Sequence, residues 1–345
     1  MFKYFLRSKL FGSIVSVAIL FSVLSLAACV DGPGSGTSSD PFLIRNAAQL
    51  KALADEVNGG DGKSGVYYKL AANIDLSAYG AGYDNGKGWA PIGNAVAPFK
   101  GNFNGSCKVI SGLFIGDNTL DYAGLFGYVS GGEVKNIGVE LATEGITGND
   151  FVGGVAGAVD RSAVSCCYAT GNVSGNNSVG GVTGLVKNGN VSTCYVTGNI
   201  SGNDSVGGAA GLVDGSTVSY CYATGNVSGN DSVGGVLGQV YSGSNVIACL
   251  AFNEEIKRVS GTNTTFGRVV GSNAGRLIFN MALSPMTVAG TSVTTGNKDD
   301  ENGVNAITFK VESAKDQLPR KQSTNLQELW RDKCRSAEKK WRRQP

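Results

Sequence analysis

Hydrophobic and polar positions in the middle of the chain repeat with a period of 27 residues. Copies of the pattern Gly-Asn-[Asp/Asn]-[Ser/Phe]-Val-Gly-Gly begin at Gly148, Gly175, Gly202 and Gly229. Valines alternate with small or polar residues in runs such as VGGVTGLV, VSTCYV and GNISG, which predict three short strands per repeat. A fixed period in a strand-and-turn composition is typical of a solenoid, in which each coil buries its apolar side against its neighbours. The pattern therefore predicts an all-β solenoid.

The segment before the repeats has a different pattern. Asn46 is a suitable N-cap for a helix that runs to about Val57, with Leu50 and Leu53 on its apolar face. The end of a solenoid exposes unpaired strand groups, so a capping element is expected there. We therefore expect a capping segment over residues 41–88. The coils are expected over residues 89–303.

The first 28 residues read as a targeting segment. Basic residues precede an apolar run that ends in Leu-Ala-Ala-Cys29. This ending resembles a bacterial lipobox, which implies cleavage before Cys29 and lipidation of its thiol. An ordinary secretory signal and a membrane anchor are the alternatives. Residues 29–40 are rich in glycine and serine and are predicted to form a flexible tether.

Residues 304–345 are basic and contain no glycine. Thr324 and Gln327 have the spacing of a capping box, and Trp330 and Trp341 fall on one face of the amphipathic helix that follows. This helix is expected to cap the last coil. Binding to an anionic membrane surface and an unfolded tail are the alternatives.

Several motifs give the chain a family resemblance. IDLS, W-x-PIG, F-x-G-x-F-x-G, G-L-F-G and the repeated V-G-G-x-x-G-x-V occur between residues 41 and 290. In these motifs the chain resembles the bacterial GLUG-repeat proteins. The resemblance implies a right-handed parallel β-helix and a surface or secreted, adhesin-like role; the motif also accompanies immunoglobulin A peptidases, and it brings no catalytic site. Residues 304–345 depart from the family, whose members usually end in a glycine-rich stretch, which leaves a truncated or frame-shifted end open.

Composition removes several functional classes. The chain has 52 glycines and a net charge of +2, so nothing in its charge calls for a nucleic-acid partner. It contains no histidine, which excludes HExxH zinc peptidases and the usual general base at neutral pH.

Stacked coils place equivalent residues in columns about 4.8 Å apart. One column contains Cys167, Cys194 and Cys221, with Cys249 following after a one-residue insertion. The small size of the neighbouring residues predicts an interior stack in which cysteine acts as a small hydrophobic residue. Disulfides and a thiolate metal ladder are the alternatives.

A second column contains Tyr168, Tyr195 and Tyr222. If this column faces outward, as we expect, three stacked rings provide a strip for binding sugars or another ligand. Rings that only shield the sheet are the alternative.

A third column contains Asp160, Lys187 and Asp214, followed by Tyr241. Carboxylates beside a basic residue occur in acid–base sites of β-helix polysaccharide lyases and hydrolases. Alternating charges at this spacing are more simply explained as a weak surface salt-bridge ladder.

A fourth column lies in the predicted turns and contains Asp204 and Asp231. Aspartate suits a tight turn, and this explanation is sufficient for the column. Two alternatives remain. The two carboxylates are weak candidates for calcium binding, and the Asp-Ser-Val sequences resemble a bacterial O-glycosylation sequon with Ser205 and Ser232 as acceptors.

Together these patterns predict a lipid-anchored protein of the bacterial cell envelope, most simply of the outer membrane and either surface-exposed or periplasmic. Its partners are expected to be the membrane, through Cys29, and a host or bacterial glycan or protein; no nucleic acid and no cofactor other than calcium is expected. No catalytic residues are predicted. A carbohydrate-active β-helix enzyme and a passive structural spacer are the rival hypotheses.

Overall fold

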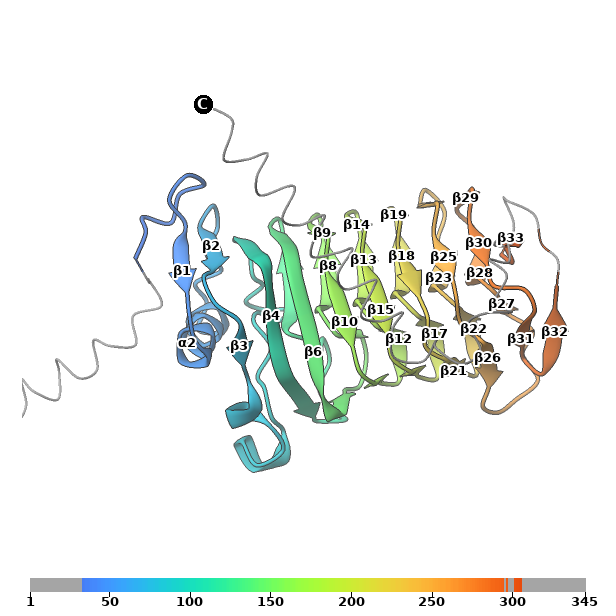
Figure 1. The fold of residues 1–345 in the computed structure, drawn as a ribbon, viewed down its shortest axis with the longest axis horizontal. Coiled ribbons are helices and arrows are strands. Elements are labelled where there is room, and N and C mark those ends of the chain that lie inside the picture. The colour runs from blue at the N-terminus through green and yellow to red at the C-terminus, as the bar shows by residue number, and fades with distance from the viewer. Residues whose placement is uncertain (1–32, 295, 297–300, 306–345) are drawn as a thin grey trace, which may run out of the picture.

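The structure, a computed structural model, describes residues 33–294, 296 and 301–305. They form a β-solenoid of about 9 turns with one α-helix, and this confirms the predicted parallel β-helix. Figure 1 shows the coils stacked along the long axis of the molecule, from β1 and α2 at one end to β31 and β32 at the other. The named strands of this described part pair in parallel, apart from the β31–β32 hairpin.

The predicted N-terminal helix is confirmed as α2 (Ala47–Asn58). The Asn46 side chain accepts a hydrogen bond from the Gln49 backbone N–H at 2.9 Å, as an N-cap does. The buried face of α2, which includes Leu50 and Leu53, belongs to the same hydrophobic core as the first coils. Two short 3₁₀ helices follow at Ser77–Tyr79 and Asp84–Gly86.

The coils contribute strands to three sheets. Sheet A contains β1 (Phe42–Ile44), β2 (Tyr67–Leu70), β3 (Ile74–Asp75), β4 (Asn102–Gly116), β6 (Glu133–Thr147), β9 (Ala163–Ser165), β10 (Tyr168–Thr170), β11 (Val173–Ser174), β14 (Asn190–Ser192), β15 (Tyr195–Thr197), β16 (Ile200–Ser201), β19 (Thr217–Ser219), β20 (Tyr222–Ala223), β21 (Val227–Gly229), β24 (Asn245–Ile247), β25 (Leu250–Ala251), β26 (Glu255–Arg258), β29 (Arg276–Ile278), β30 (Met281–Ala282), β31 (Met286–Val288), β32 (Thr291–Val293) and β33 (Val304–Asn305). Sheet B contains β5 (Phe126–Ser130), β8 (Ala156–Asp160), β13 (Thr183–Lys187), β18 (Ala210–Asp214), β23 (Leu237–Val240) and β28 (Val270–Asn273). Sheet C contains β7 (Val152–Gly153), β12 (Asn177–Gly180), β17 (Asp204–Gly207), β22 (Asp231–Gly234) and β27 (Phe266–Gly267).

Each coil has more strands than the sequence predicts, because two of the expected strands are broken by corners. The run VSTCYV is divided between β14 and β15 at Thr193, which has a φ of 55°. The run VGGVTGLV is divided between β12 and β13. Corners at fixed places in every coil explain why the polar and apolar pattern has such short segments.

The coil register follows the 27-residue period. Tyr168 pairs with Tyr195, and Tyr195 pairs with Tyr222. Lys187 pairs with both Asp160 and Asp214. The predicted columns therefore exist as ladders of neighbouring residues.

The glycines of the repeat allow the coils to approach one another. An alanine Cβ at position 211 would lie 2.4 Å from the Ser178 carbonyl carbon, and one at position 181 would lie 2.6 Å from the Gly208 carbonyl oxygen. These are backbone atoms, which cannot move aside as a flexible side chain can. The V-G-G-x-x-G pattern is thus required by close packing between adjacent coils.

The two ends of the coil stack differ from the middle. Residues 33–40, predicted as part of the flexible tether, already contact the first coil: the Gly36 carbonyl accepts a hydrogen bond from the Tyr67 N–H at 2.9 Å. At the other end, the interior cysteine column finishes at Asn280, whose side chain accepts from the Cys249 N–H at 2.9 Å. The buried Arg268 donates to the Gly303 carbonyl at 3.0 Å. Polar side chains thus bind backbone groups where the apolar stack ends.

Three predictions fall partly or wholly outside the described residues. They are the leader over residues 1–28, the lipidated Cys29 at the start of the tether, and the C-terminal helix, of whose predicted segment 304–345 only β33 is described.

Candidate functional site

The cysteine column lies in the solenoid interior, as predicted. Cys167, Cys194, Cys221 and Cys249 are buried, and each is a free thiol. The Cys194 Sγ donates to the Ser192 carbonyl at 3.3 Å, and the same contact recurs in each of these coils. Packing is therefore the correct alternative, and no disulfide joins these coils. Among the residues that the structure describes, no cluster of three or more histidine, cysteine or acidic side chains could hold a metal ion.

Burial also suppresses thiol reactivity. Desolvation raises the pKa of the Cys194 thiol well above its ordinary value, so the reactive thiolate is scarce at mildly alkaline pH. We expect Cys194 to resist maleimide in the folded protein at about pH 8 and to react at once in denaturant. Peptide mass spectrometry of the labelled sites measures this. Rapid labelling of Cys194 in the folded protein would contradict the interior position.

The tyrosine column forms a stack on the other side of the same strands. Ring centroids are 5.0 Å apart between Tyr168 and Tyr195 and between Tyr195 and Tyr222, with interplanar angles of 14° and 2°. The rings belong to a cluster separate from the interior core, whereas Ala169 on the same strand belongs to that core. The column therefore points outward.

The outward direction does not make the rings accessible. Tyr168 is 1% exposed and Tyr195 is 3% exposed, while Tyr222 is half-buried. The Tyr168 hydroxyl donates to the Glu140 carboxylate at 3.1 Å, and burial raises the pKa of Tyr222. A ligand could reach Tyr168 and Tyr195 only after they are uncovered. The sugar strip thus stays a prediction.

The charged column has the predicted register but not the predicted ion pairs. The Asp160 carboxylate pairs with Arg161 at 2.9 Å, and within the described residues Lys187 has no carboxylate partner within 4.0 Å. The prediction that these residues form a salt-bridge ladder was therefore wrong. An exposed lysine gains little from a surface ion pair and keeps its side-chain freedom in water. Tyr241 follows β23 and is partly exposed.

The turn column pairs Asp204 with Asp231 in adjacent coils. The Ser205 hydroxyl donates to Asp204 at 3.1 Å and to Gln239 at 3.0 Å, and the Ser232 hydroxyl donates to Asp231 at 3.2 Å. Ser205 and Ser232 are 4% and 5% exposed. Glycosylation at these hydroxyls would have to precede folding of the coils. Calcium binding at the two carboxylates would need further ligands. Glycosylation and calcium binding both remain predictions.

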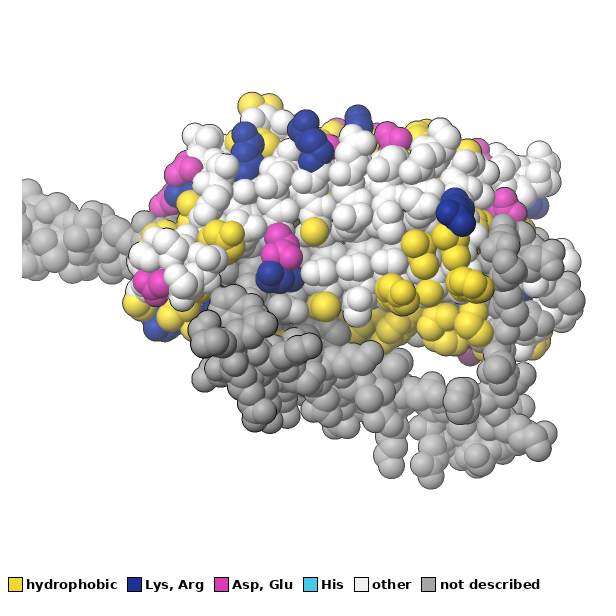
Figure 2. All heavy atoms as spheres, turned by 90° about the horizontal axis from the view of Figure 1, so that it is seen from above, with side chains coloured by type: hydrophobic (Ala, Val, Ile, Leu, Met, Phe, Trp, Pro, Cys, Tyr) yellow, Lys and Arg dark blue, Asp and Glu magenta, His cyan; other side chains and the backbone are white. Residues whose placement is uncertain are grey.

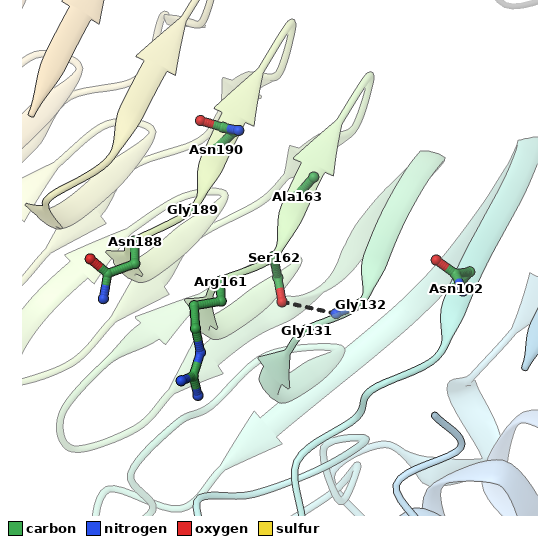
Figure 3. A pocket seen from close by; sticks show the side chains of 9 residues that line it. All are labelled: Asn102, Gly131, Gly132, Arg161, Ser162, Ala163, Asn188, Gly189 and Asn190. Carbon is green, nitrogen blue, oxygen red and sulfur yellow. Dashed lines mark hydrogen bonds between the residues drawn. The ribbon is translucent and has the colours of Figure 1, made fainter. Parts of the chain in front are cut away.

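A polar groove lies at the corner between sheets B and A. It is an open depression with a volume of about 340 Å³, and its lining residues are shown in Figure 3. Its lining consists of glycines, polar side chains and one alanine: Asn102, Gly131, Gly132, Arg161, Ser162, Ala163, Asn188, Gly189 and Asn190. We call this set the corner groove.

Local backbone geometry shapes the corner groove. Arg161 and Asn188 occupy equivalent turns of adjacent coils, with φ of 47° and 49°. The Ser162 hydroxyl accepts a hydrogen bond from the Gly132 N–H at 3.1 Å and donates to the Asp160 carbonyl at 2.8 Å. Gly131, Gly132 and Gly189 contribute no side chain to the lining, and the turns carry the Arg161 and Asn188 side chains (Figure 3).

The rim chemistry suits a hydroxylated or acidic ligand. The Arg161 side chain is 71% exposed, and its guanidinium Nη2 pairs with the Asp160 carboxylate at 2.9 Å. Asn188 and Asn190 are exposed. A guanidinium pairs with carboxylates, while an amide both donates and accepts hydrogen bonds. Arg161 was not predicted as a site residue, because the 27-residue period places Asp160 in a charged column, whereas Arg161 in the turn after it is followed one coil later by Asn188.

Two proteins are similar to part of this chain in sequence, and one solved structure is similar to it in fold. No family profile matches the chain. The chain is 33% identical over 162 residues to a protein provisionally named a Gly-rich membrane protein, from Evansella cellulosilytica. The aligned residues make up 44% of this chain and 17% of that protein. It is 35% identical over 129 residues to halomucin from Haloquadratum walsbyi, covering 37% of this chain and 1% of halomucin. The chain thus spans a small part of both relatives.

A solved structure has the same fold. The crystal structure of a protein provisionally assigned as an immunoglobulin A1 protease, from Bacteroides ovatus, matches with a TM-score of 0.62 at 23% identity. The match covers 81% of this chain and 86% of the other. This likeness supports the β-helix and nothing about activity. Among the described residues, no helix has the length and apolar character needed to cross a bilayer.

Proposed function

We propose that this protein is a lipid-anchored envelope protein whose β-helix binds glycans in the corner groove and does no catalysis. The observation that carries the binding proposal is the groove itself, an open polar depression rimmed by Arg161, Asn188 and Asn190. Because the rim offers a guanidinium beside amides, we expect a preference for polysaccharides that carry carboxylates. The lining residues come from adjacent coils, so a bound sugar chain would lie across those coils.

The envelope location is supported by the N-terminal sequence and by a relative. Cys29 follows small residues at the end of an apolar run, which is the pattern that lipidation requires. The relative from Evansella cellulosilytica carries a membrane-protein name. We place the anchor in the outer membrane. The resemblance to GLUG-repeat proteins agrees with an adhesin-like role.

The groove chemistry favours binding over hydrolysis. A glycoside hydrolase uses two carboxyl groups on either side of the scissile bond. None of the residues that line the corner groove carries a carboxylate. The two carboxylates next to the lining along the chain are both in ion pairs, Asp160 with Arg161 and Glu133 with Lys135. A passive spacer, the other rival, needs no shaped polar rim.

The binding proposal is tested by removing the groove cation. We expect Arg161→Ala to lower affinity for acidic polysaccharides by about tenfold or more on a glycan array, with a smaller loss for neutral sugars. Arg276→Thr is the matched control, because Arg276 is an exposed arginine on β29, outside the groove lining. Equal losses in the two variants would indicate nonspecific charge attraction. An unchanged Arg161→Ala profile would refute the groove.

A further inference from the structure

One corner of the solenoid changes character toward its C-terminal end. This corner lies just before the interior cysteine of the successive coils and just before Asn280 in the last one, and its residues all have positive φ, between 51° and 55°. The residues of this corner column, in chain order, are Cys166, Thr193, Tyr220, Ala248 and Phe279. The column thus gains two aromatic rings in the later coils.

The strand residues next to the corner change in the same direction. Earlier coils place serine there, at Ser165, Ser192 and Ser219, and the ladder then continues with Ile247 and Ile278. Both isoleucines are partly exposed. Serine gives way to isoleucine at Ile247 while the interior residue beside it is still a valine, Val246; in the next coil the interior residue is Leu277.

These residues form one apolar surface. Tyr220 and Phe279 are each 63% exposed. Figure 2 shows hydrophobic side chains gathered over the C-terminal coils, on a molecule whose other visible surface is mainly polar. We call Tyr220, Ile247, Ile278 and Phe279 the corner patch. A gathered apolar surface on a soluble body commonly marks an interaction site.

The two rings stand at a backbone position that does not favour them. A bulky residue at positive φ is strained, and glycine or asparagine is normally preferred there. Thr193 makes the same corner without a ring. The corner can therefore form without an aromatic residue, and Tyr220 and Phe279 add large exposed apolar surface to it.

We propose that the corner patch inserts into the interface of an anionic lipid bilayer. The patch lies on a convex corner between strands, so its rings project outward as interfacial aromatic residues do. Arg276 lies on β29 two residues before Ile278 and is exposed, in position to meet lipid phosphates.

The charge of this face agrees with an anionic surface. The outward residues of the three strands beside the patch include one arginine and no acidic residue: Thr217, Ser219, Asn245, Ile247, Arg276 and Ile278. A cation at the border of apolar groups is the combination that binds anionic lipid at a membrane surface.

The proposed lipid anchor makes weak insertion sufficient. Gly36 already contacts the first coil and is seven residues after Cys29, so the body stays within about 25 Å of a lipidated terminus. Tethering at that distance gives a high effective concentration of membrane. The patch would then hold the solenoid along the bilayer. Only this tethering by a lipid at Cys29 rests on the proposed function.

Vesicle binding of the anchor-free protein tests the proposal. The mature chain with Cys29→Ser is co-sedimented with vesicles of phosphatidylcholine containing about 30 mol% phosphatidylglycerol, and with phosphatidylcholine alone. The test variant, Tyr220→Thr with Phe279→Thr, copies the residue at Thr193 and so keeps the corner. We expect it to lose about tenfold or more in partition to anionic vesicles. Arg276→Thr, which copies Thr217, is expected to lose the preference for anionic lipid.

The controls separate this proposal from the glycan proposal. Arg161→Ala lies outside the patch and is expected to bind vesicles normally. Failure of the Cys29→Ser chain to bind anionic vesicles would overturn the proposal, as would equal binding by the double threonine variant. Sedimentation velocity without lipid reports the competing occupant. Self-association that the double variant abolishes would assign the patch to a second copy of the chain and overturn the membrane contact. None of these results depends on sugar binding.

Discussion

Replacing Cys29 with alanine is expected to move the protein from the membrane fraction to the soluble fraction. The thiol of Cys29 is the proposed attachment point of the lipid, and the corner patch alone is expected to bind weakly. Each buried methylene of an acyl chain adds about 0.8 kcal/mol, so loss of the lipid should lower membrane partition by at least about a hundredfold. Fractionation at high salt with immunoblotting measures the partition, and metabolic labelling with an alkyne fatty acid measures the modification.

A second cysteine provides the control. Cys166→Ala is expected to remain lipidated and membrane-bound, because Cys166 lies in a corner of the folded body. If Cys29→Ala stays in the membrane at its full length, the leader is an uncleaved membrane anchor. If it is cleaved and soluble while the native protein was never labelled, the leader is an ordinary secretory signal.

Gly211→Ala is expected to destabilise the body by about 3 kcal/mol. The new Cβ would lie 2.4 Å from the Ser178 carbonyl carbon and 2.5 Å from the Val179 nitrogen, so two coils would have to separate. Neighbouring coils provide most of the stability of a solenoid, and the loss should appear in the cooperative transition. Urea unfolding followed by circular dichroism measures the free energy of unfolding.

Gly82→Ala is the matched control for this change. A Cβ at position 82 would meet no atom within 4 Å, and its φ lies outside the left-handed region. This variant is expected to be neutral or slightly more stable, because alanine restricts the unfolded chain. Equal destabilisation by both alanines would show that glycine flexibility, and not coil contact, explains the repeated glycines.

The parts of the fold that repeat could be predicted from the sequence. Parallel coils in register place identical positions side by side, so a 27-residue period directly gives the cysteine and tyrosine ladders. The N-cap at Asn46 was also predictable, because capping depends on residues within one turn of helix. The strand breaks at the corners were not predicted, because threonine is not a residue type that indicates positive φ, and yet Thr193 adopts it.

The candidate sites depend on how coils differ, which a repeat comparison does not detect. Arg161 breaks the pattern of its turn, where the next coil has Asn188, and Phe279 breaks the pattern set by Thr193. The exposed fraction of a side chain could not be predicted from the sequence either. Tyr168 and Tyr195 point outward as predicted, yet both are almost fully buried. Alternation along a strand gives direction, whereas coverage depends on residues distant in the chain.

Incubating the protein with an acidic polysaccharide that it captures, and then measuring both the bound fraction and the length of the recovered sugar chains, tests the central claim most directly. A recognition protein should retain the polysaccharide, release it at its original length, and lose retention with Arg161→Ala. Shortened chains would show that the body is a lyase or hydrolase. No retention of acidic or neutral polysaccharides by the native protein would contradict glycan binding and leave a spacer as the better description.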